Sequence, residues 1–317
     1  MGKYQEIDLT KIKTISINAR KSKVSLDRLA KPVENDLTFD SFLNSLPDYL
    51  AATDFKNLVT AIVQAIGKKK PVILMMGAHP IKVGLSPVII DLMKTGIIHG
   101  LALNGAGVIH DVELSYFGCT SEEVADTLVD GSFGMSKETA DLVNQPIAKG
   151  VDKELGFGEA VGYAIQQEQP EYVKYSLLGQ AYALNIPVTV HVALGTDIVH
   201  QHPSAMGKAI GELSLRDFRI FAQSLIRLHD GGVVILLGSS VILPEVFLKA
   251  LTVARNIAGP VESFTTANLD MIRHYRPFKN VLERPTLNSG QYMALAGHHE
   301  IMFPLLAAAI KQRMNSL

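Results

Sequence analysis

The sequence contains no tryptophan and one cysteine, and only 19% of its 317 residues are charged. The lone cysteine, Cys119, excludes an internal disulfide framework and favours a reducing compartment. A formal net charge of −1 provides no basic surface for nucleic acid or an anionic membrane. The apolar runs are far shorter than the roughly 20 residues that span a bilayer, and residues 1–23 lack the apolar core of a signal peptide. We therefore expect a soluble, cytoplasmic protein without nucleic-acid or membrane partners.

Hydrophobic residues are abundant, at 47%, and they fall into short runs that alternate with segments of helical spacing. The short runs predict strands at residues 71–77, 100–105, 186–194, 231–240 and 260–268. The spaced segments predict helices at residues 53–70, 86–96, 107–118, 172–185, 214–229, 243–259 and 298–314. This alternation predicts an α/β fold with a mostly parallel sheet covered by helices on both faces.

The domain organisation follows from a change in composition near residue 38. Residues 1–38 are polar, so we interpret them as an N-terminal extension, and residues 39–317 as a single α/β domain. The less regular stretches 118–160 and 270–297 are too long for plain connectors, so we expect them to carry function.

Four of the expected strands end in glycine followed by small or polar residues: MMGAHP, LNGAG, VALGTD and LLGSS. Carboxyl ends of parallel strands meet at one edge, where small residues let backbone N–H groups approach a phosphate. None of the four is a standard fingerprint. After LNGAG, His110 stands where a dinucleotide loop would have its third glycine, and no Walker lysine follows. The predicted nucleotide-binding residues are Asn104, Gly105, Ala106, Gly107, Gly195, Thr196, Asp197, Gly238, Ser239 and Ser240.

Histidines gather at or just beyond the expected strand ends: His79, His110, His191, His200, His202, His298 and His299. No HExxH motif and no second ligand pair at a recognised spacing occurs, so acid/base chemistry is favoured over metal binding. His110 and His298 are the acid/base candidates, with Asp111 and Glu300 to orient them or to bind cationic groups. His299 and Arg284 are the substrate-binding candidates, since a guanidinium group clamps acidic groups.

The order of these segments resembles that of the deoxyhypusine synthase family over roughly residues 70–314. The resemblance rests on GLSPVIIDLMKTGIIHGLALNGAGVIHD, which matches the glycine-containing loop, helix and strand before a Thr-Ala-Gly-Gly-Val-Glu-Glu-Asp motif. It also rests on IPVTVHVALGTD, on LLGSSVI at 236–242 and on FPLL at 303–306. Asp111 and Thr266 hold comparable positions, which adds Thr266 to the cofactor-binding residues.

The resemblance implies a Rossmann-like sheet and a homotetramer with NAD between subunits. The chain departs from the family pattern where the paired glutamates become Ile109 and His110, and where the lysine-bearing segment before the last helix is absent. Transfer of an amine through an imine needs that lysine, so deoxyhypusine synthesis itself is not expected.

The expected function is therefore NAD-dependent dehydrogenation, or elimination and transfer, on a small polar or amino substrate. Two alternatives stay open: a metal-dependent hydrolase that uses the His, Asp and Glu residues, and a nucleotide-binding sensor or scaffold without turnover.

Overall fold

The computed structural model describes residues 2–33, 35 and 38–315, and its contacts divide the chain into two units, Met1–Tyr49 and Leu50–Leu317. The described part of the first unit contains short 3-10 turns and one helix: η1 Leu9–Lys11, η2 Ile17–Ala19, η3 Leu26–Arg28 and α1 Phe39–Ser45. Thr38 and Ser41 cap α1 reciprocally, since each side chain bonds to the backbone N–H of the other. The boundary predicted at residue 38 lies directly before this helix.

The second unit is built on a parallel six-stranded sheet in the order β3-β2-β1-β4-β5-β6. The strands are β1 Val72–Met76, β2 Gly100–Asn104, β3 Val188–His191, β4 Val233–Leu237, β5 Phe264–Asp270 and β6 Gly290–Ala296. Every residue of β1 and β4 is buried, because helices cover both faces of the sheet and leave no polar face. The predicted Rossmann-like α/β fold is confirmed.

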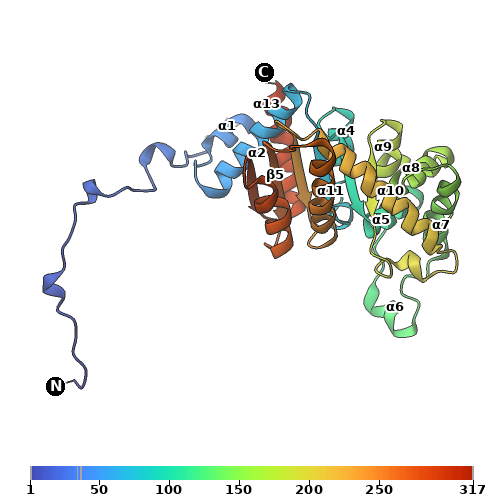
Figure 1. Ribbon diagram of the computed structural model, residues 1–317, viewed down its shortest axis with the longest axis horizontal. Coiled ribbons are helices and arrows are strands. Elements are labelled where there is room, and N and C mark those ends of the chain that lie inside the picture. Colours follow the sequence, from blue (N-terminus) through green and yellow to red (C-terminus); the bar gives the residue numbers. More distant parts are fainter. Residues whose placement is uncertain (1, 34, 36–37, 316–317) are drawn as a thin grey trace. The chain divides into compact units, whose positions relative to one another are not determined.

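Helices α10 and α11 cover one face of the sheet, and α2, α5 and α13 pack on the other (Figure 1). Helix α11 illustrates the cause, since Leu243, Phe247, Ala250 and Ala254 recur at helical spacing and are all buried. The helices and turns of this unit are α2 Leu50–Gly67, α3 His79–Lys82, α4 Ser86–Lys94, α5 Gly105–Phe117, α6 Val124–Asp130, α7 Lys137–Asp152, α8 Phe157–Glu168, η4 Val173–Tyr175, α9 Leu177–Ala183, η5 Ile198–Gln201, α10 Gly207–Ile226, α11 Ile242–Ala258, η6 Pro277–Glu283, α12 Arg284–Thr286 and α13 His299–Asn315.

Two regions differ from the sequence-based expectation. The stretch predicted to be irregular at 118–160 contains α6, α7 and the start of α8, and α7 and α8 pack on each other and on α10. The stretch at 270–297 contains the edge strand β6, whose first three residues are exposed and so give no continuous apolar run. The strand expected from residue 260 begins only at Phe264, and the helix expected over 172–185 shrinks to α9 after η4.

Among the residues that the structure describes, no helix is both long and apolar enough to cross a membrane.

Candidate functional site

The sheet order places β1 beside β4, and the chain leaves these strands in opposite directions, toward β2 and toward β5. In open parallel sheets this change of direction marks where ligands bind, beyond the carboxyl ends of the strands. A glycine directly follows each strand, and the N–H of Gly77 donates to the carbonyl oxygen of Leu237 at 3.2 Å. A Cβ atom on Gly77 would lie 2.3 Å from the carbonyl oxygen of Gly238. The two strand ends therefore meet through backbone atoms alone, which only glycine permits.

His299, the first residue of α13, packs against this glycine pair. Its side chain is buried and its Nε2 lies 3.1 Å from the carbonyl oxygen of Leu269. Because a carbonyl only accepts, Nε2 carries the proton and Nδ1 is left as a buried acceptor without a partner. Burial lowers the pKa of His299, and Asp270 opposes that shift. A Cβ on Gly238 would lie 2.6 Å from the His299 ring, so an unpaired acceptor stands directly beside the point where β1 and β4 diverge.

The turn after β2 contains the predicted nucleotide-binding residues 104–107, and it lies against the loop after β3. Asn104 caps α5, since its Oδ1 accepts from the N–H of Gly107 at 3.0 Å. A Cβ on Gly105 would lie 1.9 Å from Oδ2 of Asp197. The structure thus brings together two groups of predicted nucleotide-binding residues, 104–107 and 195–197.

The loop after β3 holds a second unpaired buried atom. Asp197 is 8% exposed and its Oδ2 has no hydrogen-bond partner, with the Nε2 of His200 at 3.9 Å. Burial raises the pKa of Asp197, and His200 partly offsets the rise. The N–H of Gly195 donates to the Nδ1 of His200 at 3.1 Å, so the Nε2–H of that ring faces the carboxylate. Thr196 closes the turn by donating to Ala193.

His110, a predicted acid/base residue, is oriented by hydrogen bonds that run from its ring through Thr120 to Glu113. Its Nδ1 lies 2.6 Å from Oγ1 of Thr120, and that hydroxyl donates to Glu113. Thr139 donates to the other oxygen of Glu113 at 3.0 Å. Since Thr120 has only one proton to donate, Nδ1 of His110 must donate to it, which leaves Nε2 as the basic nitrogen of the neutral ring. Burial lowers the pKa of His110, Glu113 opposes the shift, and Lys82 on α3 adds to it.

Asp111, also predicted as catalytic, has a different environment. Its carboxylate is fully buried and accepts from the Ser176 hydroxyl and from the backbone N–H groups of Leu177 and Leu178. Burial raises the pKa of Asp111 to about 6, against the lowering by these hydrogen bonds. The side chain thus joins α5 to the start of α9, and nothing in its surroundings presents it to a ligand.

The other predicted residues are distributed over several elements and do not form one cluster. His298 and Glu300 are largely exposed, with 3.7 Å between their ring nitrogen and carboxylate oxygen. Arg284 bonds to Asn280 and Tyr275 and lines a hollow with the end of α11. Thr266 is the third residue of the seven in β5 and is fully buried, so it lies within the strand rather than at its carboxyl end. Ser239 and half-buried Ser240 follow β4, and the Ser239 hydroxyl accepts from the N–H of Leu243 in α11.

In the described part of the chain, no group of three His, Cys, Asp or Glu side chains is arranged to hold a metal ion. The histidines of the site are instead hydrogen-bonded to hydroxyl or backbone groups.

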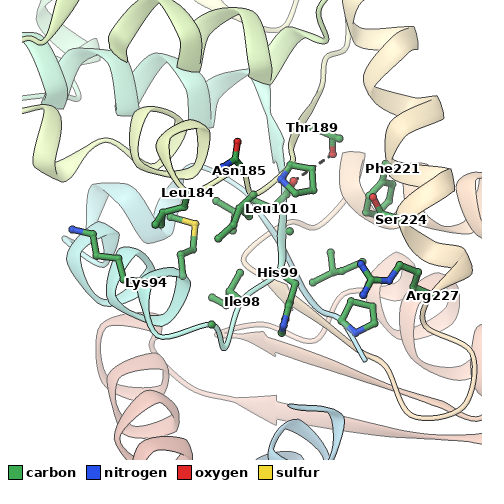
Figure 2. Close-up of a pocket in the computed structure, with 17 residues that line it drawn as sticks. Lys94, Ile98, His99, Leu101, Leu184, Asn185, Thr189, Phe221, Ser224 and Arg227 are labelled. Atoms are coloured by element: carbon green, nitrogen blue, oxygen red, sulfur yellow. Dashed lines mark hydrogen bonds between the residues drawn. The ribbon is translucent and has the colours of Figure 1, made fainter. Parts of the chain in front are cut away.

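A cavity of about 500 Å³ lies at the opposite end of the strands, at the amino ends of β1, β2 and β3 (Figure 2). It contains none of the predicted site residues, although cavities of this size commonly hold ligands. The glycine pair and the two unpaired buried atoms lie at the carboxyl ends of the strands, so the cavity at the amino ends is a separate feature.

Glu113 and Thr120 are the residues that the sequence-based prediction missed. Glu113 had a signal, because it stands three residues after His110 and therefore on the same helix face. Thr120 had none, since it follows the end of α5 at Gly118 and reaches His110 only through the path of the loop.

No protein-family model and no curated protein matches this sequence. Among solved structures, the chain is similar to a conserved protein assigned as LOR/SDH from Methanococcus maripaludis S2, with a TM-score of 0.54, 12% identity and coverage of 95% of this chain and 76% of that one. It is similar to a protein assigned as a deoxyhypusine synthase from Entamoeba histolytica, with a TM-score of 0.52, 11% identity and coverage of 88% and 95%. It is also similar to AgrE in a ternary complex with ornithine and NAD+, with a TM-score of 0.51, 13% identity and coverage of 83% and 33%. The match thus spans one third of AgrE, and at these identities the three likenesses establish a shared fold.

Proposed function

We propose that this protein is an NAD-dependent enzyme that dehydrogenates a small polar or amino substrate, or eliminates and transfers a group from it. One observation carries the proposal: the backbone contact of Gly77 with Gly238, at the divergence of β1 and β4, beside the unpaired Nδ1 of His299. The fold is shared with one third of AgrE, a protein whose structure was determined in a ternary complex with ornithine and NAD+.

The residues at the carboxyl edge suit a dinucleotide. Gly238, Ser239 and Ser240 lead into α11, and their small side chains leave room for a phosphate near its first turn. The buried acceptors on Asp197 and His299 would take hydrogen bonds from hydroxyl or amide groups, which a ribose and a nicotinamide possess. When bound there, NAD would supply a hydride acceptor.

His110 is the proposed acid/base residue, because its Nε2 lone pair is free while Thr120 and Glu113 fix the ring. Residues 284–298 contain no lysine, so no side chain there can hold an imine, and we do not propose deoxyhypusine synthesis. We further propose a cytoplasmic homotetramer, for which light scattering during size-exclusion chromatography should give four times the chain mass of 34.4 kDa.

The test is calorimetric titration of NAD into the wild type and into Gly238→Ala. An alanine at 238 would adopt a φ of +63° and meet the His299 ring, so NAD affinity should fall about tenfold or more. Gly96→Ala is the matched control, since it carries similar backbone strain at φ +69° with no atom within 4 Å of the added carbon.

If the wild type shows no heat of binding and no thermal stabilisation with NAD, the proposal is wrong. At a hundredfold excess over the dissociation constant, binding adds about 2.7 kcal/mol to the free energy of unfolding. A protein that binds NAD but reduces it with none of a panel of amines, amino acids and hydroxy acids would instead be a sensor.

A further inference from the structure

The cavity at the amino edge of the sheet has apolar walls and a polar rim (Figure 2). Met93, Ile98, Leu101, Leu184 and Phe221 supply the apolar surface, from α4, β2, α10 and the connections beside them. Its volume of about 500 Å³ falls within the range of small-molecule sites. It therefore has room for the apolar body of a small organic molecule.

The charged groups that line this cavity are all cationic. Lys94 and Arg227 lie on opposite sides of it, and no Asp or Glu lines it (Figure 2). Within the described residues, neither side chain forms an ion pair or a side-chain hydrogen bond. Two uncompensated positive charges beside an apolar hollow favour a ligand with a negative charge.

His99 adds a neutral donor between these cations. Its Nδ1 accepts from the N–H of Val72 at 3.3 Å, so its Nε2 carries the proton. Burial lowers the pKa of His99, the nearby Arg227 lowers it further, and a hydrogen bond with the backbone of Ile97 opposes the shift. The lowered pKa favours the neutral ring, so His99 adds a polar group to the cavity and no third full charge.

The ends of α4 and α10 oppose this charge only in part. Lys94 is the last residue of α4 and Arg227 follows α10, where basic residues commonly offset the negative end of the helix dipole. Each helix end is equivalent to about half a negative charge, and each side chain carries a full positive one. The carbonyl of Leu92 is moreover satisfied by the N–H groups of Ile97 and Ile98. A net positive field remains at the cavity.

We propose that the cavity binds a small organic anion, whose carboxylate or phosphate pairs with Arg227 and whose apolar body packs on Leu101, Leu184 and Phe221. This site is separate from the carboxyl edge, because the five residues of β1 and of β2, about 17 Å of extended chain, run between the two. The proposal does not depend on the proposed function.

The test uses 4-phenylbutyrate as the probe, with 4-phenylbutanol as its uncharged counterpart and acetate as the anion without the apolar body. Each is titrated into the 15N-labelled full chain, and backbone amide shifts are followed. The butyrate should bind at least about tenfold more tightly than either of the others, and the largest shifts should fall at Gly100, Ser224 and Arg227.

Arg227→Gln should weaken butyrate binding about tenfold or more, because a charge-assisted pair is lost. Arg219→Gln removes an exposed charge from α10, the helix that Arg227 follows, and should leave the affinity unchanged. The proposal would be overturned if the alcohol bound as tightly as the acid, or if the two variants had equal effects. It would also be overturned if the butyrate did not bind at about 10 mM, or if the shifts were confined to Gly105 and Gly238.

Discussion

Thr120 Oγ1 lies 2.6 Å from Nδ1 of His110 and gives its only proton to Glu113. This relationship assigns the tautomer of the imidazole, since Nδ1 must then be the protonated nitrogen. A carboxylate, a hydroxyl and an imidazole in sequence orient the ring much as a directly bonded carboxylate does in other acid/base sites. It also leaves Nε2 basic, which the proposed acid/base role of His110 requires.

The first prediction concerns this tautomer. Long-range 15N–1H spectra at pH 8 should show His110 protonated at Nδ1 in the wild type. Thr120→Val removes the acceptor and should shift the ring toward the Nε2–H form, whereas Thr120→Ser should preserve the wild-type spectrum. Observation of Nε2–H in the wild type would contradict the assignment.

Asp111 should be a structural residue, although its sequence context pointed to catalysis. Asp111→Ala leaves two N–H groups and a hydroxyl without their buried partner, so the free energy of unfolding should fall by about 3 kcal/mol. Asp111→Asn keeps an amide oxygen and should cost clearly less. Urea unfolding measures both, and Asp126→Ala on the exposed surface of α6 should change little. Equal stability of Asp111→Ala and the wild type would show that these bonds do not support the fold.

A second buried carboxylate should make stability depend on pH. Asp217 in α10 accepts from the N–H groups of Gly158 and Val190, and burial raises its pKa from 3.8 to about 7. Between these two values the folded protein holds a proton that the unfolded chain releases. The contribution of Asp217 to the free energy of unfolding should therefore fall as pH rises from about 4 to about 7, and should level off above that.

Asp217→Asn cannot titrate, so its unfolding free energy should decline less steeply over that range than the wild type's, by about 1 kcal/mol or more. Urea titrations at half-unit pH steps measure the difference. The exposed Asp126→Asn should follow the wild-type curve, and a parallel curve for Asp217→Asn would show that the carboxylate is ionised throughout.

The last prediction concerns the contact between the two loops at the carboxyl edge. Gly105→Ala would place a carbon 1.9 Å from Oδ2 of Asp197, so that side chain must move. If Asp197 holds the cofactor, NAD affinity should drop about tenfold while the thermal midpoint changes by only a few degrees. Gly211→Ala on α10 is the control, because no atom lies within 4 Å of its added carbon and the residue is outside the predicted site. Equal affinity in both variants would remove Asp197 from the site.

The sequence predicted the fold because burial on both faces of a parallel sheet requires apolar residues at every position. The strands β1 and β4 meet that requirement and β2 meets it up to Asn104, so all three stand out as short apolar runs. Strand β6 pairs only with β5, at the edge, and mixes exposed with buried residues. Helix α7 contains Pro146 and many polar residues, although Ala140, Val143 and Ile147 do recur at helical spacing. The local pattern was weak where exposed and polar residues interrupt the apolar spacing, as they do in β6 and α7.

The sequence predicted the candidate site only to the level of the carboxyl ends of the strands, and its binding role stays a prediction. Glycines at strand ends are a local signal, so the edge could be identified from sequence, and Gly238 does meet Gly77 there. The roles of individual polar residues depend on groups far away along the chain. Asp111 is occupied because α9 brings three donors to it, and His110 is oriented because Thr120 folds back onto α5. Composition and periodicity thus determined the layers, while tertiary structure decided which polar side chains keep an unpaired atom, since hydrogen-bond partners are set by proximity in space.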